Sequence, residues 1–187
     1  MVSQFISSHE VRKLGELGFE FPEGTHPIGR LDKDSEGLLI LTTNKKVTRL
    51  LFQGEIPHKR TYLVRVKYIV SQESLAQLRT GISIRVHGGE YYTTTPCEAE
   101  IVQGPEGLCA NQYNANDYVP CTWLLITLTE GKFHQIRKMV KEIKHPCVDL
   151  IRVNIEELEL GELAVGGVRE IGEEDFFEKL KIGNWRA

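Results

Sequence analysis

The 187-residue sequence has no apolar run near the roughly 20 residues that a membrane-spanning helix requires. Its first 18 residues carry the charged side chains of Glu10, Arg12, Lys13 and Glu16. They show neither the apolar centre nor the small-residue cleavage site of a secretory signal. We therefore expect no membrane association and a cytoplasmic location.

Closely spaced metal or disulfide motifs are also missing. The four cysteines, Cys97, Cys109, Cys121 and Cys147, form no C-x-x-C pair, so we predict reduced, structural thiols. The six histidines include no H-E-x-x-H motif and no pair spaced by three or four residues, so we expect no metal. With 41% hydrophobic and 26% charged residues, the composition is that of a globular chain and excludes a mostly disordered, collagen-like or coiled-coil protein.

The net charge of −3 conceals two basic blocks. Residues 28–67 hold nine basic and four acidic side chains, and residues 130–153 hold six and three, whereas the remaining segments are acidic. If the fold brings the two blocks together, they form one positive face that suits a polyanion such as nucleic acid. The alternative is that they are unrelated solvated faces.

Apolar periodicity and capping residues predict an alternation of helices and strands. In the segment 132–145, helical spacing puts Phe133, Ile136, Val140 and Ile143 on the inward side and Arg137, Lys141 and Lys144 on the other. The other expected helices are 10–18, 45–53, 71–81 and 173–180, and the expected strands are 38–41, 60–68, 97–102, 121–129, 147–153, 157–160 and 168–171.

Strands outnumber helices and do not alternate with them strictly. This order favours an α+β fold with a mostly antiparallel or mixed central sheet flanked by helices, rather than a doubly wound parallel sheet. Residues 104–120 mix Gly, Pro, Asn and Asp without periodicity and predict a surface loop, the one place where the chain could divide into two lobes. We expect residues 1–187 to form a single domain.

The segment Gly29–Leu39 is the most informative stretch. It is a polar loop, bounded by glycines, that leads directly into an apolar strand, an arrangement that holds a reactive side chain rigidly at the edge of a cleft. Taken alone, Asp32 and Asp34 are typical of turn and cap residues, and Glu36 of a solvated charge.

Three ordered motifs resemble those of the RsuA-type ribosomal RNA pseudouridine synthases. Gly29–Leu39 matches the pattern G-R-L-D-x-D-S-E-G-L-L without a gap. Lys59 to Val64 is similar to the K-x-Y element before an apolar strand, if one extra residue is admitted, and Glu130–Met139 matches E-G-x-x-x-Q-[IV]-R-[RK]-M. Family-like segments continue from His145 to Glu170.

The chain is most similar to the branch that acts on large-subunit ribosomal RNA and has no N-terminal S4 RNA-binding domain. One departure concerns the start, because the family's first strand normally passes through K-P-x-G into a segment resembling residues 2–5. We expect either that an upstream strand has been removed or that the protein is naturally short.

The resemblance implies a fold of two lobes around an active-site cleft and an enzyme that isomerises a specific uridine of ribosomal RNA to pseudouridine. This reaction breaks the N1–C1′ bond and joins C5 to C1′ with no net redox change and no added group, so no cofactor is required. The resemblance makes Asp32 the catalytic carboxylate, as nucleophile or as base. It makes Arg137 the charge partner that keeps the carboxylate ionised, and Tyr62 the ring that stacks on the target base. Otherwise Arg137 belongs to a solvated stripe and Tyr62 to the core.

The resemblance also implies a set of RNA contacts. Arg30 would fill the space that the flipped uridine leaves, and Lys33, Lys59 and Arg60 would meet phosphates. Further RNA contacts are expected from Gln135, Lys138 and Lys141. The expected partner is ribosomal RNA, bound by a monomer.

Two other functions stay open at this stage. A non-catalytic RNA-binding or ribosome-assembly protein could keep the same scaffold and basic face. A retaining glycoside hydrolase could use Asp32 with Asp34 or Glu36, but it needs carboxyl groups ~5 Å apart across a cleft, and neighbours in one loop seldom face each other in that way.

Overall fold

Long strands organise residues 59–151, about half of the chain. In the computed structural model, the described residues are 3–6, 10–52, 57–104, 119–183 and 185–186. They divide into two units: unit 1 comprises residues 1–58 and 152–187, and unit 2 comprises residues 59–151. The boundaries therefore fall at 58/59 and 151/152. The expected division at 104–120 is wrong as a boundary, and most of that loop, residues 105–118, lies outside the described residues.

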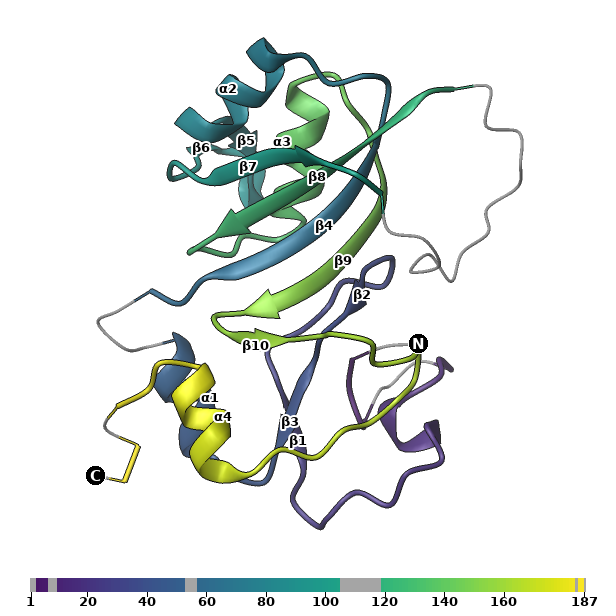
Figure 1. Cartoon of the computed structure of the whole chain (residues 1–187), viewed down its shortest axis with the longest axis vertical. Helices are drawn as coiled ribbons and strands as arrows, with labels where there is room; N and C mark the ends of the chain where they lie inside the picture. Colours follow the sequence, from purple (N-terminus) through teal and green to yellow (C-terminus); the bar gives the residue numbers. More distant parts are fainter. Residues whose placement is uncertain (1–2, 7–9, 53–56, 105–118, 184, 187) are drawn as a thin grey trace. The chain divides into compact units, whose positions relative to one another are not determined.

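The sheet of unit 2 is antiparallel. Strand β4 (Arg60–Lys67) pairs along its whole length with β8 (Cys121–Leu128), which pairs on its other side with β7 (Glu98–Val102). Strand β9 (Cys147–Ile155) lies on the far side of β4, as Figure 1 shows, and carries the chain into unit 1. In β8, buried and half-buried residues alternate strictly, which is the two-residue period that predicts this strand from the sequence.

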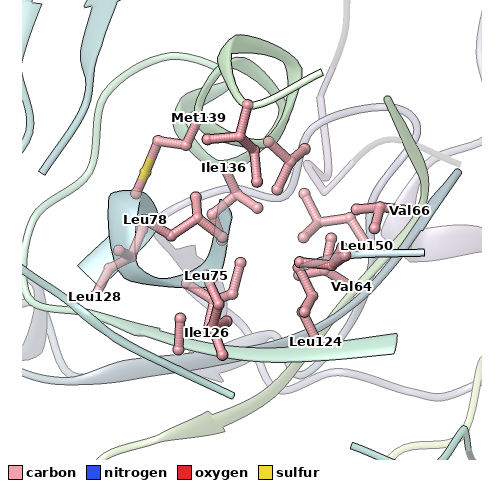
Figure 2. Packing of buried hydrophobic residues seen from close by; sticks show 14 of the residues in the cluster. Val64, Val66, Leu75, Leu78, Leu124, Ile126, Leu128, Ile136, Met139 and Leu150 are labelled. Atoms are coloured by element: carbon pink, nitrogen blue, oxygen red, sulfur yellow. The ribbon is translucent and has the colours of Figure 1, made fainter. Parts of the chain in front are cut away.

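Two helices pack on this sheet and close the core of unit 2. Helix α2 (Gln72–Thr80) begins at Ser71, whose hydroxyl accepts the Ser74 amide, and ends at Gly81 with a φ of 99°. Helix α3 (Gln135–Glu142) contributes Ile136 and Met139 to the cluster in Figure 2. A short hairpin, β5 (Ser83–Arg85) and β6 (Tyr91–Thr93), adds Ile84. The other labelled members are Val64, Val66, Leu75, Leu78, Leu124, Ile126, Leu128 and Leu150.

Unit 1 is built from shorter elements. Strand β1 (His26–Ile28) pairs antiparallel with β3 (Ile40–Thr42), while β2 (Glu36–Gly37) and β10 (Leu158–Glu159) pair with β9. Helix α1 (Lys46–Phe52) begins after Asn44, whose side chain accepts the Lys46 amide at 3.0 Å. Helix α4 (Glu173–Lys179) buries Phe176 and Phe177.

The α+β class with an antiparallel sheet is confirmed. The helices expected at 45–53, 71–81 and 173–180 are confirmed as α1, α2 and α4, and the strands expected at 60–68, 97–102 and 121–129 as β4, β7 and β8. Within the described parts of the chain, no helix is long and apolar enough to cross a membrane, and no disulfide forms.

The helix expected over 10–18 is wrong. Only a 3-10 turn, Leu14–Glu16, forms in the described part of this segment. The Leu14 amide donates to the carbonyl of Gln4 at 3.1 Å, so it is used outside the segment instead of within a helix. Ser7 and Glu10 have the spacing of a capping box, but Ser7 lies outside the described residues.

Two of the expected strands differ. Residues 168–171 form no strand; instead the Arg169 guanidinium donates to the Glu159 carbonyl at 2.8 Å, so that a side chain contacts the backbone of β10. Of the expected strand 38–41, only Ile40 and Leu41 lie in a strand, β3, because β2 ends at Gly37 and both backbone polar groups of Leu38 bond to Arg152.

Helix α3 starts three residues later than expected. His134 has left-handed backbone angles (φ 54°, ψ 32°) that interrupt the helical path before Gln135. Phe133, expected on the inward side, is 71% exposed, while Ile136, Val140 and Ile143 are buried as expected.

Candidate functional site

The loop that carries Asp32 is held at both ends in unit 1. Ser3 Oγ donates to the Leu31 carbonyl at 3.2 Å and accepts the Leu31 amide at 3.1 Å. The Ser35 amide donates to the Asp32 carbonyl at 2.9 Å and closes the turn. Asp32 itself is half-buried, whereas Lys33 and Asp34 are exposed. The loop therefore fixes the backbone of Asp32 and leaves part of its carboxyl group accessible.

Gly37 and Arg152 fix the exit of this loop. Gly37 has a φ of 101°, and a Cβ there would lie 2.3 Å from the Arg152 carbonyl oxygen, so only glycine fits. The Leu38 amide donates to the Arg152 carbonyl at 2.8 Å, and Arg152 Nε donates back to the Leu38 carbonyl at 2.8 Å. Arg152 is only 5% exposed. The glycine of the D-S-E-G motif thus serves the close approach of the loop to β9.

Tyr62 lies in β4 of unit 2, paired with Ile126 of β8. It is half-buried and packs against the hydrophobic cluster. Tyr62 thus combines packing against the core with partial exposure, and its expected stacking on the target base stays a prediction.

Arg137 lies on α3, also in unit 2, and differs from the exposed Lys141 on the same helix and from the exposed Lys144 that follows it. It is half-buried, and its Nε is shielded from solvent. Burial raises the pKa of the Cys147 thiol to about 11, and the positive charge of Arg137 acts in the opposite direction. The structure therefore separates Arg137 from the solvated stripe.

Glu130, the first residue of the third motif, is the centre of a hydrogen-bond network. Its carboxylate accepts the Tyr92 hydroxyl at 2.5 Å, the Thr95 amide at 2.9 Å and Gln135 Nε2 at 2.8 Å. Partial burial acts to raise the pKa of Glu130, but these three donors and the Lys132 charge lower it overall. Glu130 therefore ties hairpin β5–β6 to the start of α3.

Gln135 completes this network. It is 5% exposed, and its side-chain oxygen also accepts the Lys132 amide at 2.8 Å. The side chain thus bonds within the motif itself, and its expected role as an RNA contact stays a prediction.

The other expected RNA contacts lie in varied surroundings. Arg30, Lys33 and Lys141 are exposed. Lys59 Nζ is 2.7 Å from Glu98 Oε1, with both side chains more than half exposed. In the same unit, the Arg60 guanidinium lies against Gly131, where a Cβ would be 3.0 Å from Nη1. Lys138 Nζ lies 5.5 Å from the centre of the Phe133 ring.

Asp32 and Arg30 belong to unit 1, and Tyr62, Arg60 and Arg137 belong to unit 2. The first basic block, 28–67, is thus divided at 58/59, and only its last nine residues share a unit with most of the second block. The single positive face stays a prediction. Across the described ranges, no three His, Cys, Asp or Glu side chains are arranged to hold a metal ion.

Sequence reasoning missed several residues that shape the site. Ser3 and Tyr92 gave no signal, because their hydrogen bonds join segments far apart in the sequence. Arg152 lies in the family-like stretch from His145 to Glu170, but its burial against Leu38 was not predictable from that stretch.

Comparison with known proteins now decides the family. The family described as RNA pseudouridylate synthase matches residues 9–142, a span that includes Asp32, Tyr62 and Arg137. The chain belongs to the RNA pseudouridylate synthase family. The predicted resemblance is therefore confirmed at the level of the family.

Individual pseudouridine synthases agree with this assignment. A ribosomal large subunit pseudouridine synthase E of Vibrio parahaemolyticus is 34% identical over 146 residues, which are 76% of this chain and 58% of that protein. An uncharacterized RNA pseudouridine synthase of Bacillus subtilis is 35% identical over 80% of this chain and 56% of its own length. The chain thus spans somewhat more than half of these two relatives.

A solved structure supports the fold. A crystal structure of a pseudouridylate synthase superimposes with a TM-score of 0.72 and 26% identity, over 90% of this chain and 65% of that one. A Cbf5–Nop10–Gar1 complex matches at a TM-score of 0.51 with 15% identity, which concerns the fold alone.

Proposed function

We propose that this chain is a pseudouridine synthase that isomerises a uridine of ribosomal RNA, in the large subunit, and that its two units act together as one catalytic domain. The observation that carries the proposal is the family match over residues 9–142, within which the Asp32 loop stands without a gap. Three relatives, two from Vibrio and one from Xanthomonas, are named ribosomal large subunit pseudouridine synthases, which supports the substrate.

In the proposed reaction, Asp32 either attacks C1′ of the target nucleotide as a nucleophile, to be displaced when C5 bonds there, or removes a sugar proton as a base and later returns it, while the N1–C1′ bond breaks. The uracil then turns, and C5 bonds to C1′. The proton on C5 leaves as the product becomes aromatic again, and N1 gains a proton, so atoms and charge balance without a cofactor. The held backbone of the Asp32 loop supports this role, because a reacting group needs a fixed position.

Tyr62 and Arg137 are the proposed partners of Asp32. A half-buried ring suits stacking on a flipped uracil. The Nε atom of the Arg137 guanidinium is shielded from solvent. A positive charge in such a place stabilises an anion more strongly than an exposed lysine does. Arg30, exposed two residues before Asp32, is proposed to fill the space of the flipped base.

Pseudouridine mapping tests this proposal. The purified chain is incubated with a transcript of large-subunit ribosomal RNA and, separately, with small-subunit RNA. Pseudouridine is then located by carbodiimide modification and primer extension. The proposal expects modification at a discrete uridine of the large-subunit RNA. Binding of both RNAs without any pseudouridine would instead support the non-catalytic RNA-binding alternative.

A further inference from the structure

Phe133 is an exposed ring in the third motif, just before α3. It is 71% exposed, and its ring stacks on that of His134 with centroids 3.9 Å apart and an interplanar angle of 18°. An exposed apolar side chain needs no explanation by itself. A pre-stacked aromatic pair is different, because its planar surface is the one that unpaired nucleobases bind.

One lysine lies over the Phe133 ring, and further lysines lie in the same motif and on α3. Lys138 Nζ lies 5.5 Å from the centre of the Phe133 ring, and Lys132 Nζ lies 4.4 Å from that of Tyr92 in β6 of the same unit. Lys132 and Lys141 are exposed. Aromatic surface next to ammonium groups suits a ligand that offers planar bases along a chain of phosphates. It suits single-stranded RNA better than an apolar protein segment, which would leave the ammonium groups without anions.

Hydrogen bonds of Glu130 and Gln135 hold the segment that carries Phe133. Glu130 is held by three hydrogen bonds, and the Lys132 amide is held by the buried Gln135. The left-handed backbone of the half-buried His134 then interrupts the chain path before α3 begins, and the Phe133 ring stacked on it is exposed. A ring presented on such a frame loses little conformational freedom on binding, so it binds a base more tightly than a mobile ring does.

We propose that the Phe133–His134 stack binds an unpaired nucleobase of the RNA, other than the target uracil, while Lys132 and Lys138 bind neighbouring phosphates. The inference rests on the proposed function, because that function makes RNA the substrate. It adds a stacking position in unit 2 that holds the RNA by a base other than the target uracil.

Binding of two oligonucleotides tests the stack. The first is an oligouridine of about twelve nucleotides, and the second is an abasic ribose-phosphate chain of the same length, which keeps the phosphates and lacks the bases. Both are measured by fluorescence anisotropy with the full chain. Phe133→Ala should weaken oligouridine binding by about 5- to 100-fold and change the affinity for the abasic chain by less than about twofold.

Further variants separate stacking from general effects. Phe133→Trp should bind oligouridine at least as well as the wild type, whereas Phe133→Leu should lose affinity as Ala does although it stays apolar. Lys138→Gln should weaken both oligonucleotides. Ile69→Ala is the matched control, since Ile69 is 68% exposed in the same unit, and it should change neither affinity. Thermal melting should show that all variants remain folded.

The inference is overturned if Phe133→Ala binds oligouridine within about twofold of the wild type, if it weakens both oligonucleotides equally, or if the wild type binds neither. In those cases Phe133 contacts a protein or solvent. The proposed function is judged separately by pseudouridine mapping with the wild type. If the wild type forms pseudouridine but Phe133→Ala shows no base-dependent loss of affinity, the stack alone is refuted. If Phe133→Ala shows this loss but the wild type forms no pseudouridine, the proposed function alone is refuted.

Discussion

Replacing Glu130 by Gln tests how the third motif is built. The substitution keeps the size of the side chain and removes its charge. One oxygen can still accept from the Thr95 amide and from Gln135 Nε2, but the other becomes an NH2 group that faces the Tyr92 hydroxyl. The hydrogen bond to Tyr92 must then reverse its direction or break.

The expected loss of stability follows from these bonds. A hydrogen bond to a charged group contributes ~1.5–3 kcal/mol when it is shielded from solvent and less when it is partly solvated. Because Glu130 is half-buried, we expect Glu130→Gln to lower the free energy of unfolding by about 1–2 kcal/mol at pH 7. The matched control is Glu98→Gln, which removes the exposed pair with Lys59 and should cost less than about 0.5 kcal/mol.

The pH dependence of the free energy of unfolding gives a second, independent test of the Glu130 network. The pKa of Glu130 is lowered in the folded chain, so its contribution is complete above the unfolded value of about 4.3 and is lost as the pH falls through the lower folded pKa. The gap in urea unfolding free energy between wild type and Glu130→Gln should therefore be full at pH 7 and narrow below about pH 4. A gap that is absent at pH 7, or equal to that of Glu98→Gln, would refute the network.

Three further substitutions test separate parts of the site. Gly37→Ala should destabilise the chain by at least ~3 kcal/mol in urea unfolding, because its Cβ would meet the Arg152 backbone; Gly24→Ala, with a φ of 81° and no described atom within 4 Å of its Cβ, should cost only ~1–2 kcal/mol. Tyr62→Phe keeps the ring and loses the hydroxyl, so RNA affinity should persist while turnover slows about tenfold or more; equal turnover would leave stacking alone. Arg137→Met should reduce kcat/KM by at least ~100-fold, equivalent to about 2.7 kcal/mol, while the exposed Lys141→Met changes it by less than about tenfold; equal effects would remove Arg137 from the active site.

Patterns of short range predicted much of the fold. The alternation in β8 and the caps Asn44 and Ser71 are local signals, and the elements they mark are present. Strands β1, β5 and β6 were missed because each has three residues and exists only through its partner, as the fully buried Ile84 of β5 shows.

In the candidate site, too, local motifs were predictable and long-range contacts were not. The motifs named Asp32, Tyr62 and Arg137, but they gave no reason for Gly37 or Glu130. Those reasons are contacts with Arg152 and Tyr92, which are distant in the sequence. The outward position of Phe133 depends on the left-handed backbone of His134, which helical periodicity does not predict.

Tritium release from RNA labelled at C5 of uridine tests whether Asp32 catalyses the isomerisation, because isomerisation must replace the C5 hydrogen by the bond to C1′. The account predicts that Asp32→Asn binds RNA as the wild type does and releases no measurable tritium. Asp34→Asn, an exposed carboxylate in the same loop, should keep release within about tenfold. Release by Asp32→Asn within about tenfold of the wild type would contradict the account.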